Sequence, residues 1–276
     1  MKLSPEAKTV VELVRECGLI ARQQRLGDLS VEDVAGKGLI SKGDLKVDGW
    51  IKHRVGSLFP GYVTLSEESE NELSFSQLQM ENVIVADPID GTRWYKDGGN
   101  LWTISLALVV HGVINIGVIH QPDTNTLWLA EKGQGAYRKR NGKRPEPIKT
   151  LNETKLSRVK IGVGSNMSTV ETRRTMLGLL NYLIEDSRGP YIMASTALEL
   201  ALVASGIVLA GDIHPQAKPW DKAAGMLIIE EAGGAVGGWP GRETVFENGL
   251  VAAANLMLYN QLVELVKAAE CYDKGK

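Results

Sequence analysis

The amino-acid sequence predicts a mixed α/β protein in which helices pack on β-sheets, and two patterns support this fold class. Residues 102–138 contain apolar runs separated by short turns, which is typical of an antiparallel meander. After residue 147, strand-like runs alternate with helix-like segments, which is typical of an α/β layer. The run 141–147 lies between the two patterns and contains two prolines. We therefore expect an N-terminal α+β half over residues 1–147 and a C-terminal α/β half over residues 148–276.

The N-terminal half is expected to begin with two helices. Ser4-Pro5-Glu6 combines a hydroxyl cap, a proline in the first turn and an acidic residue near the positive end of the helix dipole. Apolar residues from Val10 to Ala21 then recur at helical spacing. Residues 27–43 contain four glycines and several charges, so this segment is expected to be a loop. A second helix is expected to begin near Asp44.

The remaining elements follow from short apolar runs and from periodic segments. Strands of the first half are expected at residues 63–65, 83–86, 102–110, 113–119, 126–130 and 136–138. Strands of the second half are expected at residues 160–163, 207–210 and 251–254. Helices of that half are expected at residues 169–183, 197–204, 222–232 and 255–269.

The bulk properties argue against several classes of protein. A net charge of −2 gives no reason to expect a nucleic-acid polymer as partner. No apolar run approaches the length of a membrane span, and the N-terminus lacks the features of a signal peptide. The two cysteines, Cys17 and Cys271, form no metal-ligand spacing and no disulfide framework, and Cys17 is expected to be a buried thiol. We therefore expect a cytoplasmic protein with no membrane partner.

The most informative segment is an apolar run, residues 83–86, that ends at Asp87 and continues Pro88-Ile89-Asp90-Gly91-Thr92. The run predicts a buried strand, and its carboxyl end is where open α/β sheets bind their ligands. Two carboxylates so close together at a buried strand end repel each other unless a cation or a proton lies between them. Asp87 and Asp90 are therefore candidate metal ligands.

Three further acidic residues stand at the ends of expected elements, and each also has an ordinary structural interpretation. Glu67 could be a solvated loop charge, and Asp44 could cap the second helix. Asp221 could cap the helix that follows it, which is the favoured interpretation for that residue alone. Asp87 itself, before a proline, could be a turn residue.

Taken together, the acidic motifs resemble the inositol monophosphatase family of Mg²⁺-dependent, lithium-sensitive phosphatases. The motifs occur in the family's order and are Ser66-Glu67-Glu68-Ser69, Asp87-Pro88-Ile89-Asp90-Gly91-Thr92 and Trp220-Asp221-Lys222-Ala223-Ala224-Gly225. The resemblance implies a layered α-β-α-β-α sandwich with the metals in the cleft between its halves. It also implies a homodimer that acts on a small phosphorylated substrate.

The resemblance implies two to three Mg²⁺ ions per active site. One would be held by Glu67, Asp87 and the backbone carbonyl of Ile89. A second would lie between Asp87, Asp90 and Asp221, and a third, looser ion would lie near Glu67. Oxygen ligands of this kind suit Mg²⁺.

The implied mechanism is direct attack of a metal-activated water on phosphorus, without a phosphoenzyme. Thr92 and Asp44 would orient and deprotonate the water. The amides of Gly91 and Thr92 would cradle the phosphate, an arrangement favoured if Thr92 opens a helical turn. The segment Ser195-Thr196-Ala197 would form a wall of the substrate site, with Asp90 also contacting the substrate.

The expected substrate is inositol 1-phosphate or a related small sugar or polyol phosphate. His214 stands where relatives carry an acid that binds inositol hydroxyls, although Asp212 could take that place if the loop is offset. A basic and aromatic cluster from Arg93 to Lys96 could suit a nucleotide or a second phosphate, or could be a fold contact. The alternatives are therefore a 3′(2′),5′-bisphosphate nucleotidase, a fructose-1,6-bisphosphatase and, less favoured, a non-catalytic regulatory relative.

Overall fold

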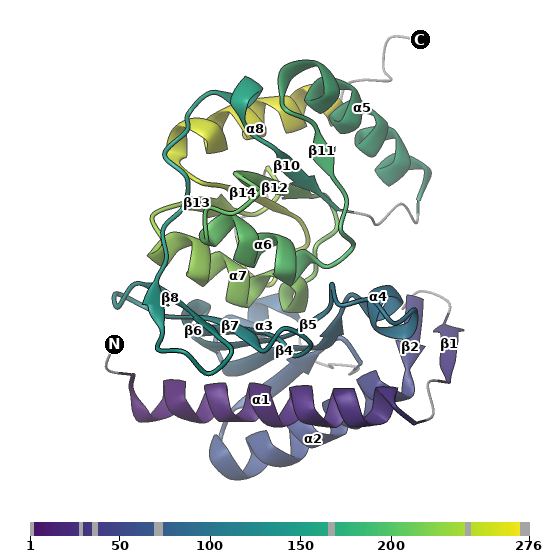
Figure 1. Ribbon diagram of the computed structural model, residues 1–276, viewed down its shortest axis with the longest axis vertical. Helices are drawn as coiled ribbons and strands as arrows, with labels where there is room; N and C mark the ends of the chain where they lie inside the picture. Colours follow the sequence, from purple (N-terminus) through teal and green to yellow (C-terminus); the bar gives the residue numbers. More distant parts are fainter. Residues whose placement is uncertain are drawn as a thin grey trace.

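The computed structural model describes residues 3–27, 30–34, 38–68, 74–164, 169–240 and 244–270, without the side chains of residues 33, 34, 38 and 75. The chain folds into five layers, in the order helices, sheet, helices, sheet, helices (Figure 1). This arrangement confirms the expected α-β-α-β-α sandwich. Cys271 and Ser69 lie outside the described residues.

The first two layers come from the N-terminal part of the chain. Helices α1 (Pro5–Arg25) and α2 (Lys42–Leu58) cover the outer face of a seven-stranded sheet (Figure 1). The sheet order follows the sequence, and β3 runs parallel to β4 whereas every later pair is antiparallel. Its strands are β3 (Val63–Ser66), β4 (Asn82–Asp90), β5 (Thr103–Val110), β6 (Val113–Gln121), β7 (Thr126–Glu131), β8 (Ala136–Arg140) and β9 (Glu146–Pro147). The expected meander is therefore confirmed.

Helices α6 (Thr196–Ala204) and α7 (Pro219–Glu231) form the middle layer and pack on the inner face of the seven-stranded sheet. Their sequences are apolar nearly all round, because both sides of this layer are covered. One apolar core cluster joins Val83, Ile119, Leu200 and Leu227, so the two parts of the chain share a core. Docking these parts of the chain brings α6 and α7 to the end of β4.

The second sheet has five strands in the order β11-β10-β12-β14-β13. These are β10 (Ile161–Val163), β11 (Pro190–Tyr191), β12 (Gly211–His214), β13 (Ala235–Gly237) and β14 (Leu250–Ala253). Helices α5 (Val170–Asp186) and α8 (Leu256–Glu270) form the outermost layer (Figure 1). Among the described residues, no helix is long and apolar enough to cross a membrane.

Helix ends agree with the capping signals in the sequence. The Ser4 hydroxyl accepts a hydrogen bond from the Ala7 amide at 3.1 Å, and the Asn255 side chain accepts one from Leu258 at 3.0 Å. Cys17 is fully buried on α1, as expected, and burial raises the pKa of its thiol. Burial of this kind suits a structural rather than a reactive thiol.

Two expectations about secondary structure were wrong. The segment 27–43 is not simply a loop, because β1 (Val31–Val34) and β2 (Gly38–Ser41) form an antiparallel pair within it. The strand expected at residues 207–210 lies later, at β12, because Val208 adopts a left-handed φ of 65° that a strand cannot contain. The strand was missed because it carries two polar side chains, Asp212 and His214, on one face.

Several short elements were also not expected. They are α3 (Phe75–Leu78), the 3₁₀ turn Leu156–Arg158 and strands β9, β11 and β13, whereas α4 (Thr92–Lys96) provides the helical turn expected at Thr92. β9 falls within the predicted boundary run and extends the seven-stranded sheet. Two- to five-residue elements carry too little periodicity to be recognised from a sequence.

Candidate active site

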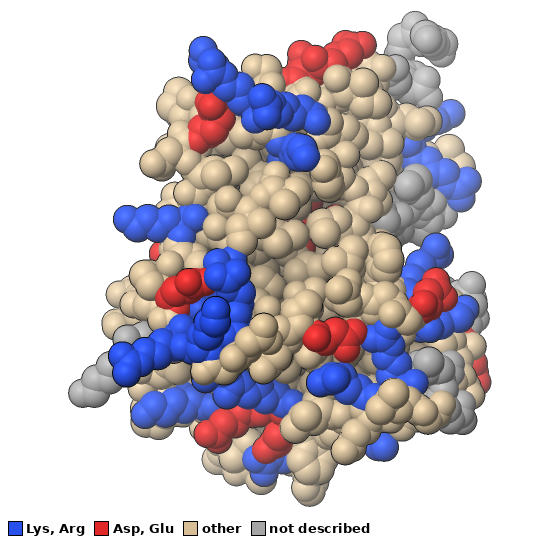
Figure 2. Space-filling view, viewed as in Figure 1, with Lys and Arg blue, Asp and Glu red and all other residues tan. Residues whose placement is uncertain are grey.

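The carboxyl end of β4 delivers Asp87 and Asp90 to the junction between the lower sheet and the middle helices. Asp87 pairs with Ser105 of β5 and Asp90 with Thr103, so three steps on β4 match two on β5. One extra residue of this kind is a β-bulge, which re-aims side chains at a strand end. Both side chains are buried. Figure 2 shows acidic atoms in the depth of a recess near the middle of this face of the molecule.

Asp87 carries a buried carboxylate that the protein alone does not satisfy. Its Oδ1 atom has no hydrogen-bond partner among the described residues. Burial, and then the neighbouring charges of Glu67 and Asp90, raise the pKa of Asp87 well above its usual range. A divalent cation would remove both penalties, because it supplies a partner for the oxygen and offsets the repulsion.

Asp90 is instead held by the start of α6. Its Oδ2 accepts hydrogen bonds from the Ser195 hydroxyl at 2.6 Å, the Ala197 amide at 2.9 Å and the Thr103 hydroxyl at 3.2 Å. Its Oδ1 accepts one from the Thr196 amide at 3.1 Å. Burial raises the pKa of Asp90, and these donors oppose that rise because they favour the ionised carboxylate.

Glu67 follows β3, which lies beside β4 in the sheet. Burial raises the pKa of Glu67 well above its usual range, and the charges of Asp221 and other nearby carboxylates add to the rise. Asp221 stands in the first turn of α7 and accepts a hydrogen bond from the Lys218 amide at 2.7 Å. Burial raises the pKa of Asp221 to about 7, with a contribution from Asp90. Asp221 therefore caps its helix and also faces the other acids.

Asp44 lies in the first turn of α2 and is fully buried. Its Oδ2 accepts hydrogen bonds from the Ser41 amide at 2.8 Å and from the Ser41 hydroxyl. Burial raises the pKa of Asp44 to about 6, and the Ser41 donors and the Thr92 hydroxyl oppose the rise. The N-cap of α2 is therefore Ser41, with Asp44 as its partner in a capping box, and the Asp44 carboxylate also faces Thr92.

Gly91 and Thr92 form the turn that follows the acids. Gly91 has a φ of 91°, and a Cβ atom there would lie 2.7 Å from the Leu101 carbonyl oxygen, so only glycine fits without strain. Thr92 opens α4, as expected, and its hydroxyl donates a hydrogen bond to the Ile89 carbonyl at 3.2 Å. The carbonyl of Ile89 thus lies beside the Thr92 hydroxyl at this turn.

The segment Ser195-Thr196-Ala197 was expected to line the substrate site, and the structure gives all three residues a contact with Asp90. Sequence reasoning missed these contacts, which join positions more than a hundred residues apart. The signal that could have found them is the small and hydroxyl-bearing run directly before an apolar helix.

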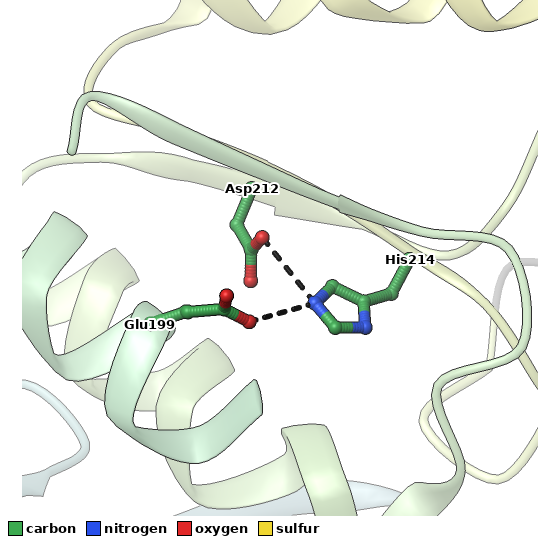
Figure 3. A group of neighbouring side chains, drawn as sticks. All are labelled: Glu199, Asp212 and His214. Carbon is green, nitrogen blue, oxygen red and sulfur yellow. Dashed lines mark hydrogen bonds and ion pairs between the residues drawn. The ribbon is translucent and has the colours of Figure 1, made fainter. Parts of the chain in front are cut away.

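His214 is buried at the end of β12 and points toward two acids (Figure 3). Its Nε2 atom lies 3.0 Å from Glu199 Oε2 and 3.3 Å from Asp212 Oδ1. Burial alone would lower the pKa of His214, but the carboxylates of Asp212 and Glu199 outweigh it and raise the pKa well above its usual range. Glu199 was missed by the sequence analysis, whereas Asp212 had been noted as an alternative to His214.

In the cluster from Arg93 to Lys96, the aromatic side chains make contacts within the protein and the basic side chains are exposed. Tyr95 is buried, donates a hydrogen bond to the Ala21 carbonyl at 2.7 Å and packs edge-on against Trp102. Trp94 donates a hydrogen bond to the Met193 carbonyl at 2.6 Å. Arg93 and Lys96 are exposed. The aromatic members are therefore fold contacts.

The charged groups gathered here suit Mg²⁺. Five acids lie close enough for their negative charges to interact, and this repulsion adds to the raised pKa values of Glu67 and Asp87. The five are Asp44, Glu67, Asp87, Asp90 and Asp221. Their donor atoms are hard oxygens, and the unpartnered Oδ1 of Asp87 is buried among them. Mg²⁺ binds such oxygens in preference to nitrogen or sulfur.

Comparison with known proteins agrees with this geometry. Residues 2–272 match the model of the inositol monophosphatase family. The chain is 33% identical to an inositol-1-monophosphatase of Mesorhizobium japonicum over 232 residues, covering 83% of this chain and 82% of the relative. It is 27% identical over 268 residues to a putative Nus factor SuhB of Neisseria meningitidis serogroup B, covering 96% of this chain and 99% of the relative.

Solved structures share the fold. The extragenic suppressor protein suhB of Bartonella henselae superposes with a TM-score of 0.83 at 26% identity. The match covers 96% of this chain and 99% of that chain.

Proposed function

Since this chain belongs to the inositol monophosphatase family, we propose that it is a Mg²⁺-dependent phosphomonoesterase that hydrolyses inositol 1-phosphate or a related small sugar or polyol phosphate. The observation that carries the proposal is the convergence of five carboxylates near the end of β4, where burial, and then the charges of the other acids, raise the pKa of Glu67 and of Asp87. Perturbed acids of this kind cluster at functional sites. A relative named as an inositol-1-monophosphatase supports the choice of substrate class.

The residues that would hold Mg²⁺ are Glu67, Asp87, Asp90, Asp221 and the carbonyl of Ile89. When bound, Mg²⁺ would supply positive charge that acidifies a water and offsets the charge of the phosphate. Three such ions would balance the charge of four carboxylates and a phosphate dianion. The donors that α6 gives to Asp90 keep that ligand ionised and fixed in orientation.

Asp44 and Thr92 would prepare the attacking water. A carboxylate with a pKa of about 6 is ionised at neutral pH and basic enough to accept a proton in the reaction. The Thr92 hydroxyl would relay or orient that proton between the water and Asp44. The amides of Gly91 and Thr92 would donate hydrogen bonds to the phosphate oxygens, with Ser195, Thr196, Ala197 and His214 on the side of the leaving group.

A regulatory role is the second candidate, because one relative of similar length is named a putative Nus factor. Every acid that the proposed chemistry needs is present in this chain. An inactive relative would have no need to keep buried acids whose mutual repulsion raises their pKa values. We therefore favour the enzyme, and propose further that it forms a homodimer, which light scattering would test.

The proposal is tested by phosphate release from inositol 1-phosphate, fructose 1,6-bisphosphate and adenosine 3′,5′-bisphosphate, with Mg²⁺ present and absent. We expect the highest kcat/KM for the inositol or sugar phosphate, and inhibition by Li⁺ competing for a Mg²⁺ position. A preference for the nucleotide of more than about tenfold would overturn the substrate class. Absence of Mg²⁺-dependent release from all three substrates would favour the regulatory role.

A further inference from the structure

A second group of side chains of metal-ligating type lies next to the candidate active site. One of them, His214, was placed above on the side of the leaving group, but none is among the proposed Mg²⁺ ligands. Glu199 on α6 and Asp212 and His214 on β12 point at one another (Figure 3). Glu199 and Asp212 are 0% exposed and His214 is 6% exposed. Each offers one ligand atom, and these atoms lie within 4.8 Å of one another.

Two carboxylates face one imidazole in this group, so even a protonated His214 leaves one negative charge unbalanced. Both carboxylates are buried, and Nε2 of the imidazole can carry only one proton for both. Apart from the 3.3 Å approach to His214, neither oxygen of Asp212 has a hydrogen-bond partner among the described residues. A fully buried carboxylate that lacks partners is costly, so its presence points to a missing ligand.

The distances from the His214 imidazole to the two carboxylates fit a shared metal ion. Ligand atoms about 2.1 Å from one ion, at tetrahedral or octahedral angles, lie roughly 3.0–3.4 Å apart. The measured separations of Nε2 from Glu199 Oε2 and Asp212 Oδ1 are 3.0 and 3.3 Å. A doubly charged ion with two carboxylates and a neutral imidazole gives a net charge of zero.

The groups around these side chains hold them as metal ligands are usually held. The other oxygen of Glu199, Oε1, accepts a hydrogen bond from the Met193 amide at 2.7 Å. The other ring nitrogen of His214, Nδ1, lies 3.3 Å from the Thr196 hydroxyl, which can accept its proton and so leave Nε2 free to coordinate. Gly162 and Gly164 of the neighbouring strand segment leave room, because a Cβ atom at either would clash with Asp212 or His214.

We propose that Glu199, Asp212 and His214 bind a divalent first-row transition-metal ion, such as Zn²⁺ or Mn²⁺, at a site distinct from the Mg²⁺ carboxylates. The imidazole nitrogen selects such an ion over Mg²⁺, which prefers oxygen ligands. Thr196 links the two sites, because its hydroxyl contacts His214 and its amide donates to Asp90. The ion therefore fixes the start of α6, and with it the orientation of Asp90. The proposal does not depend on the phosphatase activity.

The test is metal binding to protein stripped with a chelator, in an excess of Mg²⁺. Equilibrium dialysis with Zn²⁺ is expected to give one tightly bound ion, and Co²⁺ is expected to give visible ligand-field absorption. His214→Gln and Asp212→Asn should weaken Zn²⁺ binding by at least about 100-fold, since even losing a supporting contact costs about 10–100-fold. The matched control is Asp87→Asn, which alters the Mg²⁺ carboxylates and should retain the Zn²⁺ ion.

A second measurement avoids the risk that a buried variant fails to fold. In the native protein, a long-range ¹H–¹⁵N spectrum resolves the imidazoles of the four histidines. Addition of Zn²⁺ should shift Nε2 of His214 and leave its Nδ1 protonated. Zinc binding that survives His214→Gln but is lost in Asp87→Asn would assign the ion to the Mg²⁺ carboxylates and overturn the proposal. A His214 imidazole that keeps protons on both nitrogens in excess Zn²⁺ would overturn it as well.

Discussion

The carboxylate of Asp90, at the end of β4, accepts a hydrogen bond of 2.9 Å from the backbone amide of Ala197, in the first turn of α6. This contact joins the seven-stranded sheet to the middle helices across 107 positions of the chain. Ser195 and Thr196 donate to the same carboxylate. A candidate metal ligand therefore also accepts hydrogen bonds from amides at the start of a helix, which have no partner within that helix.

Asp90→Asn should lower stability as well as activity. Both oxygens of Asp90 accept hydrogen bonds, and asparagine replaces one of them by an NH₂ group. That NH₂ group would face an existing donor, so at least one hydrogen bond is lost. We expect a loss of about 3 kcal/mol in the free energy of unfolding, which urea denaturation of the metal-free protein would measure. An unchanged unfolding midpoint would contradict the importance of these contacts.

Asp87→Asn should lower activity without lowering the stability of the metal-free protein. The Asp87 carboxylate has an unpartnered oxygen and a pKa raised by burial and by neighbouring acids, so a neutral side chain costs little without metal. We expect unchanged or higher stability of the metal-free protein and a fall of more than about 100-fold in Mg²⁺-dependent kcat. Turnover equal to that of the native enzyme would contradict the metal-ligand assignment.

Ser41→Ala should change the pH profile through Asp44. The Ser41 donors lower the pKa of Asp44, so removing the hydroxyl raises that pKa and moves the acid limb of kcat/KM to higher pH. The loss of the helix cap should cost about 1 kcal/mol. Ser4→Ala is the matched control, because Ser4 caps α1 in the same way. It should cost similar stability and leave the acid limb in place, and equal shifts in both variants would exclude Asp44 as the base.

The metal-free protein should lose stability as the pH rises from about 4 to about 7. The pKa values of Asp44 and Asp221 are raised to about 6 and about 7, so between about pH 4 and pH 7 these two carboxyls bind more protons in the folded chain than in the unfolded chain, and we expect them to outweigh the opposite contribution of His120, whose pKa is lowered to about 4. Its free energy of unfolding therefore falls with rising pH. Thermal unfolding with and without Mg²⁺ checks this, and an ion at 100 times its Kd should restore about 2.7 kcal/mol near neutral pH. A stability that rises across this range without metal would contradict the burial of these acids.

The acids at the end of β4 could be predicted because their signal is local. An apolar run, two aspartates, a glycine and a threonine occur within ten residues, and the structure confirms the strand and the turn. Asp44 and Asp221 were predictable as helix-terminal residues, whatever their further role. Such patterns can be recognised from the sequence because residues close together in the chain determine them.

The environment of His214 could not be predicted, because it depends on α6 and β12, which meet only in the folded chain. Glu199 stands in an apolar helix as its single acid, and nothing nearby in sequence explains its burial. Asp212 and His214 interrupt the apolar pattern of β12, which shifted the expected strand to residues 207–210. Polar residues in a buried strand contradict local expectation, and such conflicts mark functional sites.

The contact of Asp90 with α6 also bears on the synthesis of the chain. A ribosome releases β4 and its two aspartates long before α6 and α7, which supply the donors to Asp90 and the carboxylate of Asp221. The nascent protein lacks the amides that orient Asp90 until residue 197 has emerged, and it lacks Asp221 until residue 221 has emerged. The complete set of candidate site residues therefore assembles late in translation, when the second half of the chain docks onto the first.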